Sequence, residues 1–283
     1  MSMLLGAHIS AAGGVSLVPG RAAELGCNTA QFFSRSPQSW RSRRLDLSQA
    51  AGFRKGRAQN GIAPVFIHIS YLINLASADK KLFLSSVEAF VEDMRDAEIL
   101  GADYIVSHMG CHKGAGEDAG LARFSGALNT IIKKTAGSSV GILLENSAGS
   151  GSCLGYDFSH QRRVLEALED TGRVGTCLDT AHAFASGYDL STASGLAELL
   201  KEIQDQTGTE KLRLVHLNDS RSPCGSRVDA HEHIGKGMIG LAGMRRIVNH
   251  PFLKNLPFIL ETPKDGVRAD AINLSTVKEL RGR

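Results

Sequence analysis

Residues 212–235 combine an apolar run with several side chains that can bind a metal ion. The run ends at His216, and Asp229, His231 and His233 follow within one connection. Asp229 and His231 stand two residues apart, so on an extended backbone both side chains leave the same face and could bind one cation. Taken alone, this stretch would more often be a solvated polar loop, so the case for a metal depends on the rest of the chain.

Eight short apolar runs recur along the chain and predict β-strands, with helix-like segments between them. The clearest helix is 79–100, where apolar residues from Phe83 to Met94 follow helical spacing behind an N-cap at Asp79. No linker or change of composition interrupts the alternation, which favours one α/β domain over 1–283, a closed (β/α)₈ TIM barrel with a parallel sheet. The strands are expected at 4–10, 29–34, 64–69, 103–109, 140–146, 174–180, 212–218 and 257–262, and the other helices near 14–25, 48–59, 119–135, 159–169, 193–206, 240–249 and 270–281.

A histidine or a carboxylate stands at or near the carboxyl end of seven of these runs. In a (β/α)₈ barrel those ends, and the loops after them, build the active site. With His182, Asp229 and His231 added, the inventory suffices for two or three divalent cations, since each needs three or four protein ligands. The seven strand-end residues are His8, His68, His108, Glu145, Asp179, His216 and Glu261.

Each of these residues also has a structural interpretation. A single strand-end histidine is more often a core group or a partner of a ligand, and we keep that interpretation for His8 and His233. The repeated position favours metal ligands at the other strand-end histidines. Glu145 and Glu261 end strongly apolar runs, where a helix dipole or an arginine could stabilise a buried carboxylate, but a metal ion is the stronger expectation.

Two further segments carry side chains suited to nucleic acid. Residues 34–44 place four arginines around Trp40, which combines charge for phosphates with a stacking surface, although a solvated basic loop fits equally well. Residues 70–77 place Tyr71 and Leu72 where they could wedge into a duplex or simply cap the barrel. The four arginines are Arg35, Arg41, Arg43 and Arg44.

Charge and cysteine usage limit the class of protein. The 32 basic and 29 acidic residues give a net charge of +3, which is too small to predict a nucleic-acid partner, so that argument must be local. The five cysteines are spread widely and never form CxxC, which argues against a disulfide framework or a thiolate metal site and favours a reducing compartment. No signal-like segment opens the chain and no apolar stretch reaches about 18 residues, so we expect a cytoplasmic protein without a membrane partner.

Several long motifs are specific enough to indicate a family. They are GAHISAAGG (6–14), SYLINLA (70–76), LLENSAGSGSCLG (143–155), CLDTAHAFASGYD (177–189), HLNDSRSPCGSRVDAHEHIGKGMIG (216–240) and ILET (259–262). On these motifs the chain resembles, over nearly its whole length, the endonuclease IV family of zinc-dependent apurinic/apyrimidinic (AP) endonucleases. The resemblance implies a DNA repair enzyme that hydrolyses the phosphodiester 5′ to an abasic site in double-stranded DNA. Its products would be a 3′-hydroxyl and a 5′-deoxyribose phosphate.

The same resemblance implies three zinc ions held by nine residues. Glu145 would bridge two of the ions and so be central to catalysis. The implied ligands are His68, His108 and Glu145 for the first ion, Glu145, Asp179, His216 and Glu261 for the second, and His182, Asp229 and His231 for the third.

The resemblance also implies that Tyr71 and Leu72, with the loop 35–40, enter DNA at the lesion. That loop usually reads KNPRQW in the family, whereas this chain reads RSPQSW, so Gln38 replaces the inserted arginine and a different grip on DNA is expected. Met109 follows His108 where a proline is common. The expected DNA contacts are Arg35, Gln38, Trp40, Tyr71 and Leu72.

The main alternative is a xylose-isomerase-like sugar isomerase or epimerase, because such barrels also place His, Asp and Glu at strand ends. Sugar chemistry would need fewer ligands, so His182, Asp229 and His231, together with the arginine and tryptophan loop, favour the nuclease. A non-enzymatic metal- or DNA-binding protein is a distant third alternative, since binding alone would not require so many converging acids. A monomer is the simplest expectation for the oligomeric state.

Overall fold

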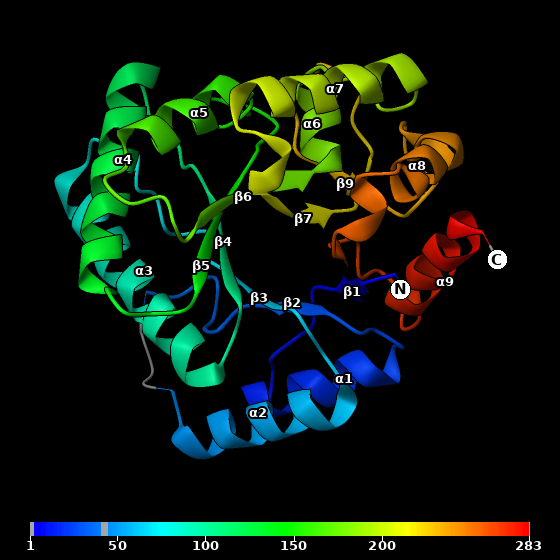
Figure 1. The fold of residues 1–283 in the computed structure, drawn as a ribbon, viewed down its shortest axis with the longest axis horizontal. Helices are drawn as coiled ribbons and strands as arrows, with labels where there is room; N and C mark the ends of the chain where they lie inside the picture. The colour runs from blue at the N-terminus through cyan, green and yellow to red at the C-terminus, as the bar shows by residue number, and fades with distance from the viewer. Residues whose placement is uncertain (1–2, 41–44, 283) are drawn as a thin grey trace.

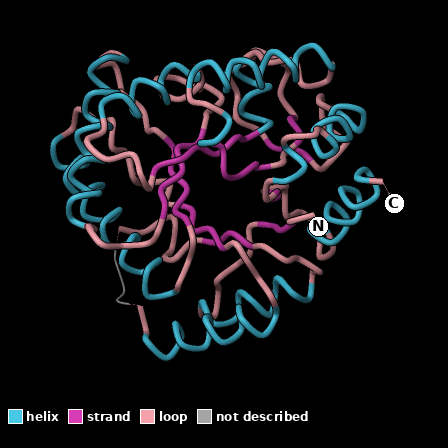
Figure 2. The backbone as a smooth tube through the Cα atoms, viewed as in Figure 1, coloured by secondary structure: helices cyan, strands magenta, loops and turns pink. Residues whose placement is uncertain are grey.

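The computed structural model describes residues 3–40 and 45–282 and shows a ring of strands surrounded by helices (Figures 1 and 2). Within these residues eight parallel strands form one sheet, in the order β1-β10-β7-β6-β5-β4-β3-β2. The predicted (β/α)₈ barrel is confirmed, and each predicted strand forms with ends somewhat shorter than expected. The strands are β1 (Leu5–Ala7), β2 (Ala30–Phe32), β3 (Val65–His68), β4 (Tyr104–His108), β5 (Gly141–Glu145), β6 (Val174–Asp179), β7 (Leu212–His216) and β10 (Phe258–Leu260).

The ring closes where β1 meets β2. A parallel bridge joins His8 to Gln31, and the Ile9 N–H donates to the Gln31 carbonyl at 2.7 Å. The two strands approach so closely that a Cβ at Gly6 would collide with the Thr29 carbonyl, so glycine is required there. At this seam β1, which pairs with β10 on its other side, meets β2.

Helices cover the outside of the ring. Asp79 caps the longest described helix, α3, as predicted, by accepting a hydrogen bond from the Leu82 N–H. Helix α6 was not predicted, because it begins directly at the end of β6 with no loop to announce it. No helix in the described ranges is both long and apolar enough to cross a membrane. The helices are α1 (Val18–Glu24), α2 (Leu47–Asn60), α3 (Lys80–Leu100), α4 (Glu117–Lys134), α5 (Phe158–Ala167), α6 (Thr180–Ser186), α7 (Ala193–Gln206), α8 (Gly240–Asn249) and α9 (Ala269–Arg281).

The inside of the barrel is filled by a small apolar core of fully buried side chains. Six of its members each stand two residues before a residue predicted to bind metal. Side chains two apart on a strand point to the same side, so the predicted ligands must also point into the barrel, one layer nearer its mouth. These core residues are Phe66, Val106, Leu143, Cys177, Leu214 and Ile259.

A short antiparallel hairpin, β8 (Asp219–Ser220) with β9 (His231–Glu232), extends from the end of β7 and was not predicted. It pairs Ser220 with His231. The hairpin therefore brings the metal-binding motif of the 219–240 segment back toward the barrel.

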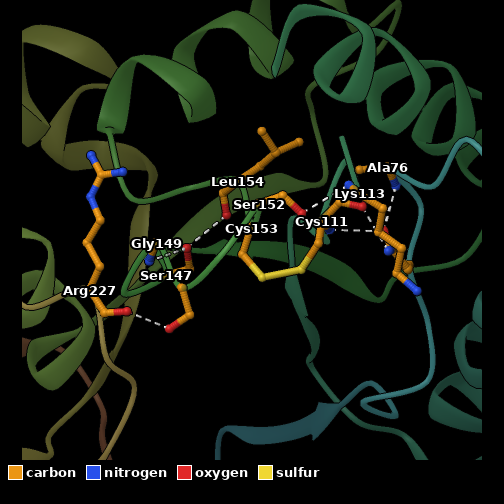
Figure 3. The surroundings of a disulfide bond; sticks show 11 residues. Ala76, Cys111, Lys113, Ser147, Gly149, Ser152, Cys153, Leu154 and Arg227 are labelled. Atoms are coloured by element: carbon orange, nitrogen blue, oxygen red, sulfur yellow. Dashed lines mark hydrogen bonds between the residues drawn. A yellow bond between two sulfur atoms is a disulfide. The ribbon is translucent and has the colours of Figure 1, made fainter. Parts of the chain in front are cut away.

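The expectation that the chain has no disulfide is wrong for one pair of cysteines. Cys111 and Cys153 form a disulfide between the loops that follow β4 and β5 (Figure 3). They are 42 residues apart in sequence, but β4 and β5 are neighbours, so the loops leaving them meet. The Lys113 N–H donates to the Ser152 Oγ at 3.0 Å and joins the same loops. Wide spacing and an odd count concealed this pair because strand adjacency, rather than sequence distance, decides which cysteines meet.

Thiol titration of the denatured protein tests this cross-link. Without a reductant, three thiols should react, those of Cys27, Cys177 and Cys224, and all five should react after reduction. Cys111→Ser should free the Cys153 thiol, so the number of reactive thiols should be the same with and without the reductant. Five reactive thiols before reduction would show that the pair stays reduced.

Candidate metal centre

Three groups of histidines and carboxylates lie at the carboxyl ends of the strands, within the part of the chain that the structure describes. In each group the candidate ligand atoms lie within 4.8 Å of one another. Glu145 and Asp179 each belong to two groups, so the three form one continuous cluster. The groups are His68, His108 and Glu145; Glu145, Asp179, His216 and Glu261; and Asp179, His182 and His231.

Glu145 lies between the first two groups and is almost completely buried. Its Oε2 is 3.3 Å from His68 Nε2 and 3.5 Å from His108 Nε2. Its Oε1 is 2.9 Å from His216 Nδ1. Burial by itself would raise the pKa of Glu145, but the imidazoles of His108 and His216 hold it well below its usual range. The two oxygens of one ionised carboxylate thus face two different groups, which is the geometry that a bridging ligand needs.

The third group differs from the sequence-based set, because Asp179 replaces Asp229 in it. Asp229 is nevertheless close, with Oδ2 3.2 Å from His182 Nε2 and Oδ1 3.5 Å from His231 Nε2. Burial raises its pKa, but the hydrogen bond from His182 and the nearby imidazoles outweigh burial and lower the pKa of Asp229 to about 2. All three predicted residues are therefore together, and Asp179 joins them from β6.

This donor set fits a divalent cation. Three carboxylates, those of Glu145, Asp179 and Glu261, share one group around a fully buried imidazole, so their charges repel one another unless a cation lies among them. The buried Nε2 of His231 has no hydrogen-bond partner among the described residues, as expected for an atom reserved for a metal. Imidazole nitrogens mixed with carboxylate oxygens are ligands typical of zinc.

Two asparagines that the sequence analysis did not single out hold the carboxylates in place. Asn146 accepts from the Asp179 N–H at 2.7 Å and donates to the Asp179 carbonyl at 3.0 Å. Asn218 Nδ2 donates to Asp179 Oδ2 at 2.6 Å, and its Oδ1 accepts from the Glu261 N–H at 2.8 Å. Each stands within two residues of a strand-end ligand in a matched motif, and that position was the available signal. Such partners orient metal ligands and fix their geometry.

His8 and His233, interpreted from sequence as structural, lie outside the three groups. His8 Nδ1 is 3.4 Å from Glu261 Oε1, and burial lowers the pKa of His8. His233 Nε2 is 3.1 Å from an oxygen of Asp265, on the outer side of the site.

Asp219 anchors the segment that supplies Asp229 and His231. Its fully buried carboxylate accepts hydrogen bonds at 2.8–3.3 Å from five backbone N–H groups of that segment. A Cβ at Gly237 would collide with this carboxylate, so the close wrapping of the segment depends on glycine. The donors are Ser220, Gly235, Gly237, Ile239 and Gly240.

Asp219→Asn should therefore destabilise the protein. The new amide NH₂ cannot accept, so backbone donors facing that side stay unpaired, at about 1–3 kcal/mol for each. Urea unfolding of zinc-free protein should show a loss of at least about 2 kcal/mol. Asp170→Asn is the matched control, because the exposed Asp170 accepts from one backbone N–H, that of Gly172. An equal, small effect for both substitutions would contradict the anchoring role.

Of the residues expected to contact DNA, Arg35 is turned toward α3. Its side chain is only 9% exposed, with Nε 2.7 Å from Asp93 Oδ1 and Nη1 3.3 Å from Glu92 Oε2. Its Nη2 donates to the Ala89 carbonyl at 2.7 Å. Arg35 thus fastens its loop to α3, and its guanidinium is engaged there rather than free for a phosphate. Arg41, Arg43 and Arg44 lie outside the described residues.

The other expected DNA contacts lie on the surface near the cluster. Gln38 is exposed, Trp40 is 42% exposed and Tyr71 is 66% exposed, while Leu72 is half-buried. Trp40, Tyr71 and Leu72 line one cavity of about 510 Å³ that also reaches His108 and Asp229. Tyr71 further lines a second cavity, of about 470 Å³, which His68, His182 and Glu261 also line. Large aromatic and aliphatic side chains therefore stand at the rim of the metal-binding cluster.

A (β/α)₈ barrel with a histidine and carboxylate cluster at its carboxyl face defines the class of metal-dependent barrel enzymes. Residues 19–281 match the family described as xylose isomerase-like TIM barrel. The chain is 43% identical over 280 residues to the probable endonuclease 4 of Methanoculleus marisnigri and 41% identical over 281 residues to that of Nitratidesulfovibrio vulgaris, covering 99% of each chain in both cases. The crystal structure of endonuclease IV from Thermus thermophilus superposes with a TM-score of 0.87 at 35% identity and 98% coverage of both chains. The chain therefore belongs to the endonuclease IV family.

Sugar-epimerase structures share the fold of this chain. A D-tagatose 3-epimerase-like protein superposes with a TM-score of 0.73 at 16% identity, covering 98% of this chain and 97% of that one. Likeness at that identity shows a shared barrel and carries no function.

Proposed function

We propose that this protein is an AP endonuclease, which hydrolyses the phosphodiester 5′ to an abasic site in double-stranded DNA. The observation that carries the proposal is Glu145, whose two oxygens face separate histidine groups in a chain that matches endonuclease 4 proteins along its whole length. A phosphodiester is anionic and resists attack, so its hydrolysis requires concentrated positive charge on one side of the phosphate.

The residues present would hold three zinc ions, as the family resemblance implies. The ligands would be the nine predicted ones, and Asp179, which belongs to two groups, would serve the third ion as well as the second. Bound zinc would supply Lewis acidity, which neutralises charge on the phosphate oxygens, stabilises the departing 3′-oxygen and lowers the pKa of an attacking water. Glu145, Asp179 and Glu261 would fix the positions of that charge because their own backbone and side-chain partners hold them still.

The rim residues would recognise the lesion. An abasic nucleotide leaves the duplex cheaply because it has no base to unpair or unstack. Tyr71 and Leu72 would fill the resulting gap, and Trp40 would offer a stacking surface beside them; in support, all three line one cavity that reaches His108. The loops carrying these residues are joined by the Ser70 Oγ, which donates to the Pro37 carbonyl at 2.8 Å. Gln38, exposed on the same loop, would contact DNA where other members use arginine.

A lysine Schiff base is the competing chemistry for strand cleavage at abasic sites. None of the eight described barrel strands ends in a lysine. Lys264 lines the 470 Å³ cavity, but its Nζ lies 2.5 Å from Asp270 Oδ2, so its amine is engaged in an ion pair and is poorly placed to attack a sugar aldehyde. We therefore propose hydrolysis, with a 3′-hydroxyl and a 5′-deoxyribose phosphate as products. We also retain the expectation of a monomer that works in the cytoplasm, where DNA is its substrate.

Incubation of purified protein with a duplex oligonucleotide containing one abasic site tests this function. The expected result is one nick 5′ to the lesion, full loss of cutting with a strong chelator, and recovery on adding zinc. A polymerase should extend the nicked strand without further processing. A blocked 3′-end, trapping by borohydride, or cutting that resists the chelator would refute hydrolysis at a metal centre.

Glu145→Gln tests the bridging role. The amide keeps the shape of the side chain but removes its charge and one acceptor oxygen, so near-total loss of turnover is expected with DNA binding largely retained. Gel-shift affinity and single-turnover rates on abasic DNA measure the two properties. Glu98→Gln is the control, because Glu98 lies with residues at the amino ends of the strands, where it hydrogen-bonds Ser139. Full activity in Glu145→Gln would make Glu145 a structural residue.

A further inference from the structure

Strand β2 contributes no histidine or carboxylate to the three groups found in the described residues, yet it places one polar side chain against them. Gln31 is fully buried in the middle of β2. Its Nε2 donates to Glu261 Oε1 at 2.6 Å, and its Oε1 lies 2.8 Å from His216 Nε2. It therefore contacts two candidate ligands that come from different strands, β7 and the end of β10.

The chemistry of these partners fixes the orientation of the amide. An ionised carboxylate only accepts hydrogen bonds, so the NH₂ of Gln31 must face Glu261. The amide oxygen must then face His216, and only a protonated His216 Nε2 can donate to it. In the neutral imidazole the proton on Nε2 leaves the lone pair of Nδ1 available to a cation.

The freed nitrogen points into the cluster. His216 Nδ1 lies 2.9 Å from Glu145 Oε1, 3.3 Å from Glu261 Oε2 and 3.9 Å from Asp179 Oδ2. These are the other members of its group, so Nδ1 is the atom that would bind the metal. One amide thus selects the metal-binding nitrogen of a histidine and orients a carboxylate that would bind the same ion.

We propose that Gln31 is a positioning residue for the second metal site, the group formed by Glu145, Asp179, His216 and Glu261. It acts by hydrogen-bonding the outer atoms of His216 and Glu261, so that their inner atoms are presented to one cation. This inference rests on the proposed function, since it needs that site to bind zinc. Partners of this kind typically contribute about 10–100-fold to metal affinity.

The backbone of Gln31 has a separate role, which makes the side chain testable by itself. The Gln31 carbonyl accepts from the Ile9 N–H, and its backbone pairs with that of His8 at the barrel seam. Gln31→Met keeps these backbone bonds and nearly the same side-chain volume, but removes the side-chain hydrogen bonds to Glu261, His216 and His8. The matched control is Gln161→Met, because Gln161 is also fully buried and its Nε2 donates to the Leu144 carbonyl at 2.9 Å, without touching a ligand side chain.

The experiment dialyses each protein against buffers of graded free zinc and counts bound zinc by elemental analysis. Gln31→Met should lose one equivalent at about 10–100-fold higher free zinc than the unmodified protein, while Gln161→Met should match the unmodified protein. Thermal unfolding of the zinc-free proteins should be similar for both variants. A zinc curve for Gln31→Met that overlies the unmodified one would overturn the inference, as would equal weakening of every equivalent together with a lowered melting temperature. Failure of the unmodified protein to bind zinc at all would instead overturn the proposed function.

Discussion

Repulsion among buried carboxylates is the constraint on which the mouth of this barrel depends. Glu145, Asp179 and Glu261 converge in a space that excludes most water, where each negative charge raises the free energy of the others. The fold stabilises them with histidine rings, asparagine amides and backbone N–H groups, and these partners leave the inner oxygens directed at one another. Without a cation, the repulsion among these carboxylates destabilises the folded protein. A bound cation removes that repulsion, which strengthens cation binding.

The position of each ligand follows from a simple property of strands. A buried apolar residue stands two positions before each of six candidate ligands. The same alternation therefore fills the barrel and places the candidate ligands one layer nearer its mouth. The sequence therefore predicted the fold, the eight strands and the convergence of the six strand-end candidate ligands. It could do so because a strand-end position encodes both depth in the barrel and direction of the side chain.

Other features could not be predicted, because they depend on neighbours in space. The sharing of Asp179 between two groups, the Cys111–Cys153 cross-link and the pairing of Arg35 with Asp93 each join residues on different strands or helices. Spacing in the sequence carries no information on such distances. The role of Gln31 could not be predicted for a related reason. Glutamine is not a usual metal ligand and Gln31 does not end its strand, so its role depends on its contacts with Glu261 and His216.

The order of strands in the barrel also determines when the site can form during synthesis. Strand β1 pairs with β10, the last strand of the barrel in sequence, and Glu261 immediately follows β10. A nascent chain that has not yet extended past residue 261 lacks both the closing strand and one carboxylate of the second group. The contacts of Glu261 with His8 and Gln31 are thus among the most non-local of the described residues, and such contacts form slowly because a long loop must close first. Closure of the barrel and completion of the second group therefore depend on the same final stretch of the chain.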